Sequence, residues 1–198
     1  AFASDACLSL KDIVNQTNQR LVKLQTFPEL HDECRKFLKK EFKPALKEII
    51  QREVAYLERM KFSYDDPLPQ ENWTLSPSDF GFHNTIRSTS GNLVFIDFEY
   101  FGWDDPVKLI ADFIWHPAMT LNDDHKKRWV ENSFLIFKNT EEIKQRFHAA
   151  WPLYGMRWAM ILLNEFRKDG WEKKLHVDEN LEKLREQKHR EQVDKAVA

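Results

Sequence analysis

Three side chains that could carry chemistry lie close together in the middle of the sequence. Asp79 and Asn84 are separated by four residues, and Asp97 follows a short apolar run from Leu93 to Ile96. Carboxylate and amide oxygens are the hard donors that Mg²⁺ prefers, and a carboxylate beside a hydroxyl can orient it and accept its proton. The order of the three groups is the order used for phosphoryl transfer, which predicts a base at Asp79 and metal ligands at Asn84 and Asp97.

Two short strands should hold these groups together. Thr85 to Arg87 and Leu93 to Ile96 are strand candidates, and the residues between them, STSGN, are typical of a hairpin turn. Because a hairpin brings its two ends together, Asn84 and Asp97 should meet at one end. A lone Asp and Asn in a loop is ordinarily turn chemistry, so the catalytic interpretation depends on the hairpin and on the segment IDFEY.

Helical periodicity dominates the sequence before this stretch. Apolar residues recur at helical spacing from Leu8 to about Leu24, and again from Pro28 to Leu57, where Pro44 should kink or split the helix. The segment DDPLPQENW is typical of an irregular connector. The central stretch is therefore preceded by helices alone.

A turn is expected from Gly102 to Pro106, directly after the metal segment. Asp104 or Asp105 should cap the helix that follows over VKLIADFIWH, and Pro117 should end it. This helix is strongly apolar, which predicts that it is buried.

Further helices are predicted up to the end of the chain. Asn122 or Asp123 should cap one of them, and Thr140 should begin another. The most apolar segment, FHAAWPLYGMRWAMILLNEF, is expected to be the central helix, interrupted near Pro152 and Gly155. The charged stretch NLEKLREQKHREQVDKAVA predicts a peripheral helix with a frayed end.

Composition limits the kind of partner. Lys plus Arg (30) nearly balance Asp plus Glu (32), and a net charge of -2 gives no overall attraction for nucleic acid or anionic membrane. No run reaches the ~20 apolar residues of a membrane span. Two cysteines are too few for a disulfide framework, which favours a reducing, cytoplasmic setting. We expect a single helical lobe over residues 1–198 with a local ligand site.

The motifs SDFGFHN and IDFEYFGWDDP resemble the catalytic loop and metal-binding segment of the aminoglycoside phosphotransferase and choline kinase-like family. IDFEY is similar to choline and ethanolamine kinases, and the resemblance covers about Ser76 to Asp112. It implies a mainly α fold, the helical C-terminal lobe of a protein-kinase-like phosphotransferase, with a small β-hairpin carrying the catalytic and metal segment. It further implies Asp79 as base, Asn84 and Asp97 as Mg²⁺ ligands, ATP as donor, and a small amine- or sugar-type hydroxyl compound as acceptor.

The sequence departs from the family's pattern in the loop itself. Family members usually have a His two residues before the base, and Pro77 occupies that position here. Ser76 or Ser78 could supply a substitute hydrogen bond, and His83 could brace the loop or contact substrate. The resemblance therefore implies a loop with an altered support.

A second departure concerns the nucleotide. The family's glycine-rich strand pair and strand lysine have no counterpart ahead of Asp79. We therefore expect this chain to be the C-terminal lobe of a longer protein whose nucleotide-binding lobe is missing here, and to be inactive by itself. The alternative is a non-catalytic helical binding module that retains the loop as structure.

Five more residues are candidates for acceptor binding, each with a structural alternative. Glu99 could bind a cationic substrate or pair with a nearby base, and Asp112 could face substrate or anchor the catalytic segment. Trp103 and Trp158 could belong to an aromatic wall, although core packing is their ordinary role. Glu165 could add negative charge to a substrate pocket or form a surface salt bridge.

Overall fold

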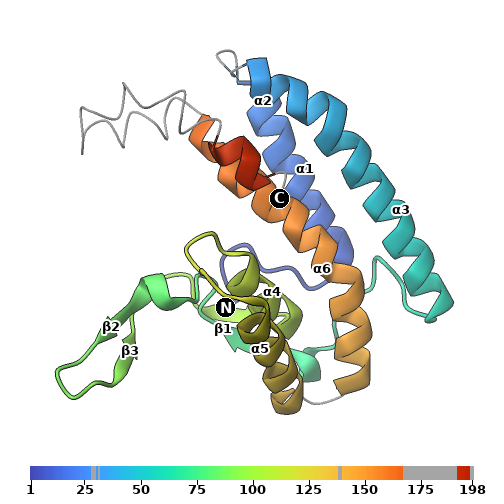
Figure 1. Ribbon diagram of the computed structural model, residues 1–198. Coiled ribbons are helices and arrows are strands. Elements are labelled where there is room, and N and C mark those ends of the chain that lie inside the picture. The colour runs from blue at the N-terminus through green and yellow to red at the C-terminus, as the bar shows by residue number, and fades with distance from the viewer. Residues whose placement is uncertain (28–29, 31, 138–139, 167–190, 197–198) are drawn as a thin grey trace, which may run out of the picture. The chain divides into compact units, whose positions relative to one another are not determined.

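A computed structural model gives the fold of the chain, and Figure 1 shows its helices and strands. Of the described residues, 64% are helical and 8% are in strands, and these residues include a small two-stranded hairpin. The mainly α class and the hairpin are therefore confirmed. The structure describes residues 1–27, 30, 32–137, 140–166 and 191–196.

Two compact units divide the chain. The first comprises residues 1–13 and 53–154, and the second comprises residues 14–52 and 155–198. Three helices contribute residues to both units: α1 (Leu10–Gln25), α3 (Lys43–Arg59) and α6 (Thr140–Leu162). The single lobe expected over the whole chain stays a prediction.

The second unit is helical around an apolar core. Helix α2 (Asp32–Phe37) runs into a π-helical turn, η1 (Leu38–Phe42), and α3 begins immediately after it. Pro44 is the second residue of α3 and has no N–H to donate, and its ring crowds the preceding turn, so the backbone widens just before it. A π-helical turn thus separates α2 from α3 just before Pro44, while the backbone remains helical through Phe37 and Lys43. Buried core residues include Leu21, Leu24, Cys34, Leu38, Phe42, Leu46, Met160 and Leu163.

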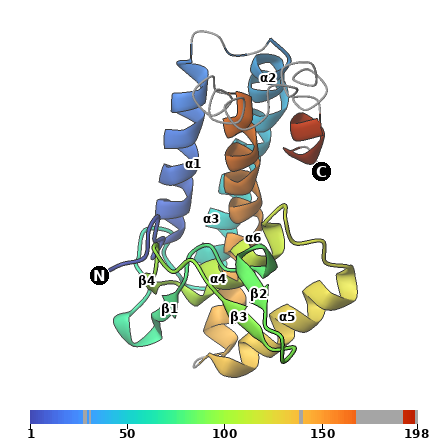
Figure 2. The same ribbon diagram turned by 90° about the vertical axis from the view of Figure 1, so that its left-hand side faces the viewer.

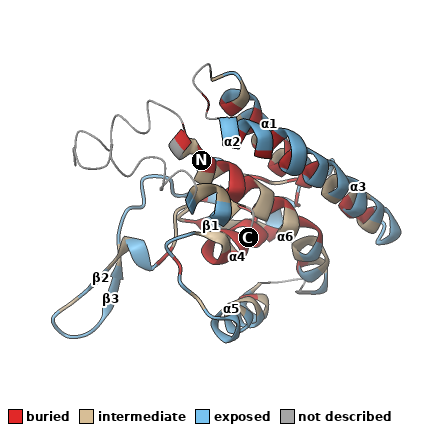
Figure 3. Cartoon of the chain, turned by 45° about the horizontal axis from the view of Figure 1, so that its top comes forward, coloured by how far each residue is buried: buried red, intermediate tan, exposed pale blue. Residues whose placement is uncertain are grey.

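The first unit holds the predicted hairpin. Strand β2 (Thr85–Arg87) pairs antiparallel with β3 (Leu93–Phe95), with Thr85 opposite Phe95. Gly91 in the turn has φ 87°, a left-handed conformation that glycine adopts without steric cost. Most of the hairpin is exposed, and it extends away from the helices of its unit (Figures 1 and 3).

A second two-stranded sheet lies at the base of the loop. Strand β1 (Thr74–Ser76) pairs antiparallel with β4 (Gly102–Asp104), so the turn predicted at the start of Gly102 to Pro106 is wrong. Residues at the N-terminus explain the difference, because Trp103 donates to the Ala1 carbonyl and accepts from the Ala3 N–H (Figure 2). A Cβ on Gly102 would lie 2.3 Å from the Ala3 nitrogen, so only glycine allows this approach.

The helix caps follow the sequence. Asp105 Oδ1 accepts from the Val107 N–H at 2.8 Å at the start of α4 (Pro106–Trp115). Asn122 Oδ1 accepts from the His125 N–H at 2.9 Å at the start of α5 (Asp123–Ile136). Both caps are confirmed. By contrast, α6 continues through Pro152, so the interruption expected there is not formed.

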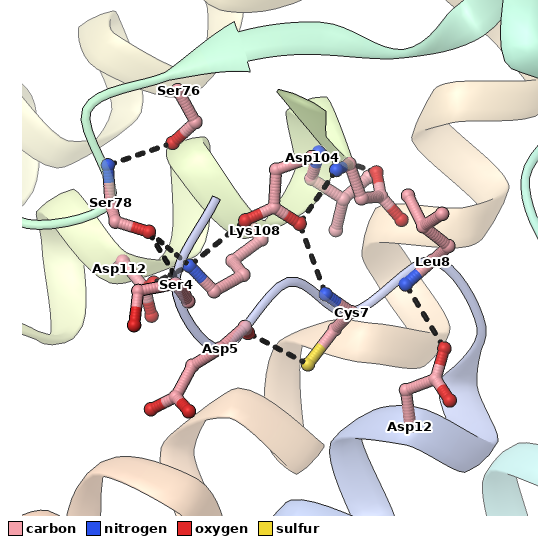
Figure 4. A network of polar contacts seen from close by, with 12 residues as sticks. Ser4, Asp5, Cys7, Leu8, Asp12, Ser76, Ser78, Asp104, Lys108 and Asp112 are labelled. Carbon is pink, nitrogen blue, oxygen red and sulfur yellow. Dashed lines mark hydrogen bonds and ion pairs between the residues drawn. The ribbon is translucent and has the colours of Figure 1, made fainter. Parts of the chain in front are cut away.

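Lys108 is a buried charge at the centre of the first unit (Figure 4). Its Nζ lies 3.1 Å from Asp104 Oδ2 and 3.1 Å from Asp112 Oδ2, and it donates to Ser78 Oγ at 3.4 Å. Asp104 Oδ1 accepts from the Cys7 N–H at 3.0 Å. Burial raises the pKa of Asp104, and the charge of Lys108 opposes that shift. The cluster joins the N-terminal segment, β4, α4 and the loop.

The two cysteines are buried and form no disulfide. Cys7 belongs to the first unit and Cys34 to the second, and neither side chain is exposed. Burial raises the pKa of the Cys34 thiol to about 12. A buried apolar setting keeps a thiol protonated and unreactive.

The charged C-terminal stretch lies largely outside the described residues. Within it, residues 191–196 are helical, and Val193 and Ala196 pack against the core of the second unit. Among the helices of the described ranges, none combines the length and the apolar character that crossing a membrane requires.

The buried position of Lys108 predicts a large effect of removing its charge. Lys108→Met would leave Asp104 and Asp112 buried without their cation, and we expect it to lower the free energy of unfolding by about 3–5 kcal/mol in urea denaturation. Lys11→Met is the matched control, because the Lys11–Asp65 pair is 3.1 Å apart but its side chains are 50% and 59% exposed. This control should cost less than about 1 kcal/mol. Equal losses in the two variants would contradict the prediction.

Candidate active site

The loop between β1 and β2 is held by its serines. Ser76 Oγ accepts from the Ser78 N–H at 3.1 Å, and Ser78 Oγ donates to the Ser4 carbonyl at 2.9 Å (Figure 4). Ser78 adopts a φ of 68°, which is unusual for a residue with a side chain. Its hydrogen bonds therefore fix the backbone just before Asp79, on the C-terminal side of Pro77.

The carboxylate of Asp79 is surrounded by nitrogen donors. His83 Nε2 lies 3.0 Å from Asp79 Oδ1, and Asn84 Nδ2 donates to Asp79 Oδ2 at 3.3 Å and to the Asp79 carbonyl at 2.9 Å. His116 Nε2 lies 3.6 Å from the same Oδ1. These donors orient the carboxylate. The side chain of Asp79 remains 41% exposed, so a ligand can reach it.

His116 is a site residue that sequence reasoning missed. It follows α4, and its ring stacks on that of His83 with centroids 4.0 Å apart and planes 4° apart. Its Nδ1 accepts from the Ala118 N–H at 3.1 Å, so the neutral ring carries its proton on Nε2, facing Asp79. The sequence offered one signal, a histidine between a buried helix and a proline, but nothing in the spacing connected it to the loop.

The ligand atoms of Asp79, His83 and His116 all lie within 4.8 Å of one another, close enough to hold a metal ion. Two observations favour a hydrogen-bonded cluster instead. A nitrogen lone pair lies in the plane of its ring, and a metal at ~2 Å cannot lie in both ring planes when the rings are stacked with centroids 4.0 Å and planes 4° apart. The bond from Ala118 also leaves Nε2 of His116 protonated. A metal here would require a ring to rotate and a hydrogen bond to break.

Asn84 and Asp97 meet at the base of the hairpin. The Ile96 N–H donates to the Asn84 carbonyl at 3.0 Å, which places Asp97 one residue beyond this pairing. Asp97 is exposed and has a φ of 65°, a conformation that Asp tolerates better than most residues. Because Asn84 uses its amide nitrogen toward Asp79, its amide oxygen is left for another partner. The amide oxygen and the Asp97 carboxylate are a donor set that fits Mg²⁺.

Negative charge gathers at this end of the hairpin. A hydrogen bond with Glu99 is the largest cause that raises the pKa of Tyr100, and the charges of Glu99, Asp97 and Asp79 raise it further. The charges of three carboxylates therefore raise the pKa of one phenol. Such a concentration of negative charge suits a cation.

The remaining candidates fall into different places. Asp112 is buried against Lys108, which is the anchoring alternative rather than a position facing substrate. Trp103 lies in β4 and is bound to the N-terminal residues through its backbone. Trp158 is buried in the second unit, and the side chain of Glu165 lies outside the described residues. The structure thus brings together Asp79, His83 and Asn84, and Asp97 follows one residue beyond the pairing of Ile96 with Asn84.

Comparisons of the chain with protein-family models, curated proteins and solved structures find no match. Membership of a phosphotransferase family therefore stays a prediction that depends on the motifs and on the geometry of the loop.

His116 predicts a pH dependence of stability. Burial is the main cause that lowers its pKa from 6.5, and the neighbouring His83 lowers it further. Below pH 6.5 the unfolded ring takes up a proton before the folded ring does, so this contribution to stability is lost as the pH falls from 6.5 through the folded pKa. We expect the free energy of unfolding of His116→Gln, measured by urea denaturation, to fall less steeply from about pH 7 to pH 5 than that of the wild type.

The exposed His125 on α5 provides the control for this measurement. His125→Gln should follow the wild-type pH dependence. If His116→Gln and the wild type lose stability in parallel on acidification, the assigned environment of His116 is wrong.

Proposed function

We propose that this chain supplies the catalytic and acceptor-binding part of a phosphotransferase that moves the γ-phosphoryl group of ATP to a hydroxyl of a small molecule. The main support is the carboxylate of Asp79, which is oriented by His83 and Asn84 and still accessible. A base in this role must be both fixed and reachable.

Asp79 is the proton acceptor in this proposal. Each carboxylate oxygen has two lone pairs, so the bonds from His83 and Asn84 leave capacity for the hydroxyl of the acceptor. The hydroxyl oxygen forms a bond to the γ-phosphorus, and the bond from that phosphorus to the bridging oxygen of ADP breaks. The proton passes to Asp79, which later releases it to solvent.

Asn84 and Asp97 would hold Mg²⁺ through the amide oxygen and the carboxylate. When bound, the ion neutralises charge on the phosphate oxygens. Asn84 has a second part in this arrangement, because its amide nitrogen donates to Asp79. One residue would therefore tie the position of the base to the position of the phosphate.

The nucleotide itself needs further protein. The sequence ahead of Asp79 has no recognisable glycine-rich strand pair or strand lysine, so we propose that ATP is bound by a lobe outside this sequence. Apolar side chains exposed on and beside the hairpin support this, since large exposed apolar patches mark surfaces that another protein part covers. They include Ile86, Leu93, Val94, Ile96, Phe98 and Phe101.

The second candidate is a binding module without activity that retains the loop as structure. Its support is that same lack of a nucleotide lobe, together with the bonds of Ser78 and Asn84, which would order the loop with or without catalysis. Amine- and sugar-type acceptors remain open under the first candidate, and measurement of activity separates the two.

Substitution of the base and of one metal ligand tests the proposal. In the complete protein that contains this chain, Asp79→Asn and Asp97→Asn should each reduce ATP consumption with a panel of amino alcohols, sugars and aromatic alcohols by about 10²–10⁴-fold. Asn preserves size and tolerates the φ of 65° at position 97. Asp123→Asn, at the exposed start of α5, is the control and should retain full turnover. Turnover at the wild-type rate in both variants would overturn the roles of Asp79 and Asp97, and no turnover by the wild-type protein with any compound of the panel would favour the binding module.

A further inference from the structure

An aromatic cleft opens beside the loop that carries Asp79. Its volume is about 480 Å³, within the range of small-molecule sites. All of its walls belong to the first unit, and they come from the loop, β3, α4 and α5. The aromatic residues of the walls are Phe80, Phe82, Phe95, Phe113 and Trp129.

The rings of the cleft are already packed in place. Phe80 stacks on Phe95 with centroids 4.7 Å apart, and Phe113 stacks on Trp129 at 4.0 Å. The indole N–H of Trp129 donates to the Ile110 carbonyl at 3.1 Å, which fixes the plane of this ring. Flat, preformed apolar faces are complementary to a flat apolar ligand.

The polar residues of the cleft decide which substituents such a ligand can carry. Arg128 and His125 line it, and among its described lining residues none is acidic. A cationic amine would therefore find no counter-charge, whereas an anionic group could reach Arg128. A sugar would also be poorly served, because Asn132 is the one amide in the lining and buried hydroxyls need partners.

Phe80, one wall of the cleft, directly follows Asp79 in the chain, while Asp79 itself is not among the lining residues. We propose that the cleft binds a hydroxyl compound with a flat, apolar body and an anionic substituent directed to Arg128. The role of this compound as the phosphoryl acceptor rests on the proposed function. The cleft therefore disfavours the amine- and sugar-type acceptors that the resemblance implies and favours a different class of hydroxyl compound.

The binding test uses the full chain without nucleotide. We expect 4-(hydroxymethyl)benzoate to bind most tightly, benzyl alcohol more weakly, and choline and glucose weakest, as measured by NMR shifts of the Trp129 indole signal. Choline or glucose binding as tightly as 4-(hydroxymethyl)benzoate would overturn the proposal, as would the absence of binding by both aromatic compounds.

Two neighbouring residues on α5 give a matched pair of variants. Arg128→Gln should weaken binding of 4-(hydroxymethyl)benzoate about two- to five-fold and leave benzyl alcohol unchanged. Lys127→Gln should change neither, because Lys127 faces Glu131 at 3.8 Å and does not line the cleft. Equal effects of the two variants would overturn the role of Arg128.

Filling the cleft tests its location. Asn132 is exposed at the rim, so Asn132→Trp should fold, and it should abolish binding of both aromatic compounds. Unchanged binding in a folded variant would place the ligand elsewhere and overturn the proposal. If circular dichroism shows that this variant is unfolded, the comparison of Arg128→Gln with Lys127→Gln decides whether the ligand binds in the cleft.

A separate assay with ATP and Mg²⁺ in the complete protein distinguishes the two proposals. Phosphorylation of 4-(hydroxymethyl)benzoate that Asn132→Trp removes is the expected result. Binding without phosphorylation of any compound would overturn the proposed function and the acceptor role, while the cleft would stand as a binding site. Phosphorylation of an amine or a sugar that Asn132→Trp leaves unchanged would preserve the proposed function and overturn the acceptor proposal.

Discussion

Burial of the Lys108 ammonium is the constraint on which the first unit depends. Removing an ion from water costs several kcal/mol, and that cost is offset only when carboxylates and hydrogen-bond acceptors are in place. Here they come from β4, from α4 and from the loop, through Asp104, Asp112 and Ser78. Oδ2 of Asp104 has no partner with hydrogen-bond geometry among the described residues and depends on the ammonium charge. The position of the loop is therefore set by electrostatics in the core, through Ser78, which lies directly between Pro77 and Asp79.

The geometry around Asp79 follows from this support. Ser78 and Asp97 both have φ values in the left-handed region, at 68° and 65°, which costs about 1–3 kcal/mol each for residues other than glycine. Such conformations persist where surrounding bonds fix them. Ser78 directly precedes Asp79, and Asp97 lies one residue beyond the pairing of Ile96 with Asn84. His116, which follows α4, adds a donor to those of the loop itself. The loop around Asp79 is thus held in part by contacts that originate elsewhere in the fold.

Local features were predictable from the sequence, and long-range ones were not. The hairpin could be predicted because STSGN and its flanking strands carry their own turn chemistry, and Asp105 and Asn122 could be assigned as caps because a cap acts within three residues. The pairing of β1 with β4 depends on the N-terminal residues reaching Trp103, and no periodicity encodes that contact. Long-range contacts also determine the position of His116, the burial of Lys108 and the cleft, so the sequence did not predict them. The aromatic walls of the cleft come from four separate elements.

The placement of the cysteines has a kinetic consequence. Cys7 and Cys34 are each enclosed in a different unit, and a thiol reacts with an alkylating reagent only as an accessible thiolate. Modification of either one must therefore wait for its own surroundings to open. The rate at which each cysteine is alkylated in the wild-type chain would therefore measure the opening of its own unit. If the units open independently, the two rates should respond differently to Lys108→Met, because of the two cysteines it is Cys7 whose backbone N–H donates to Asp104, the carboxylate that Lys108 balances.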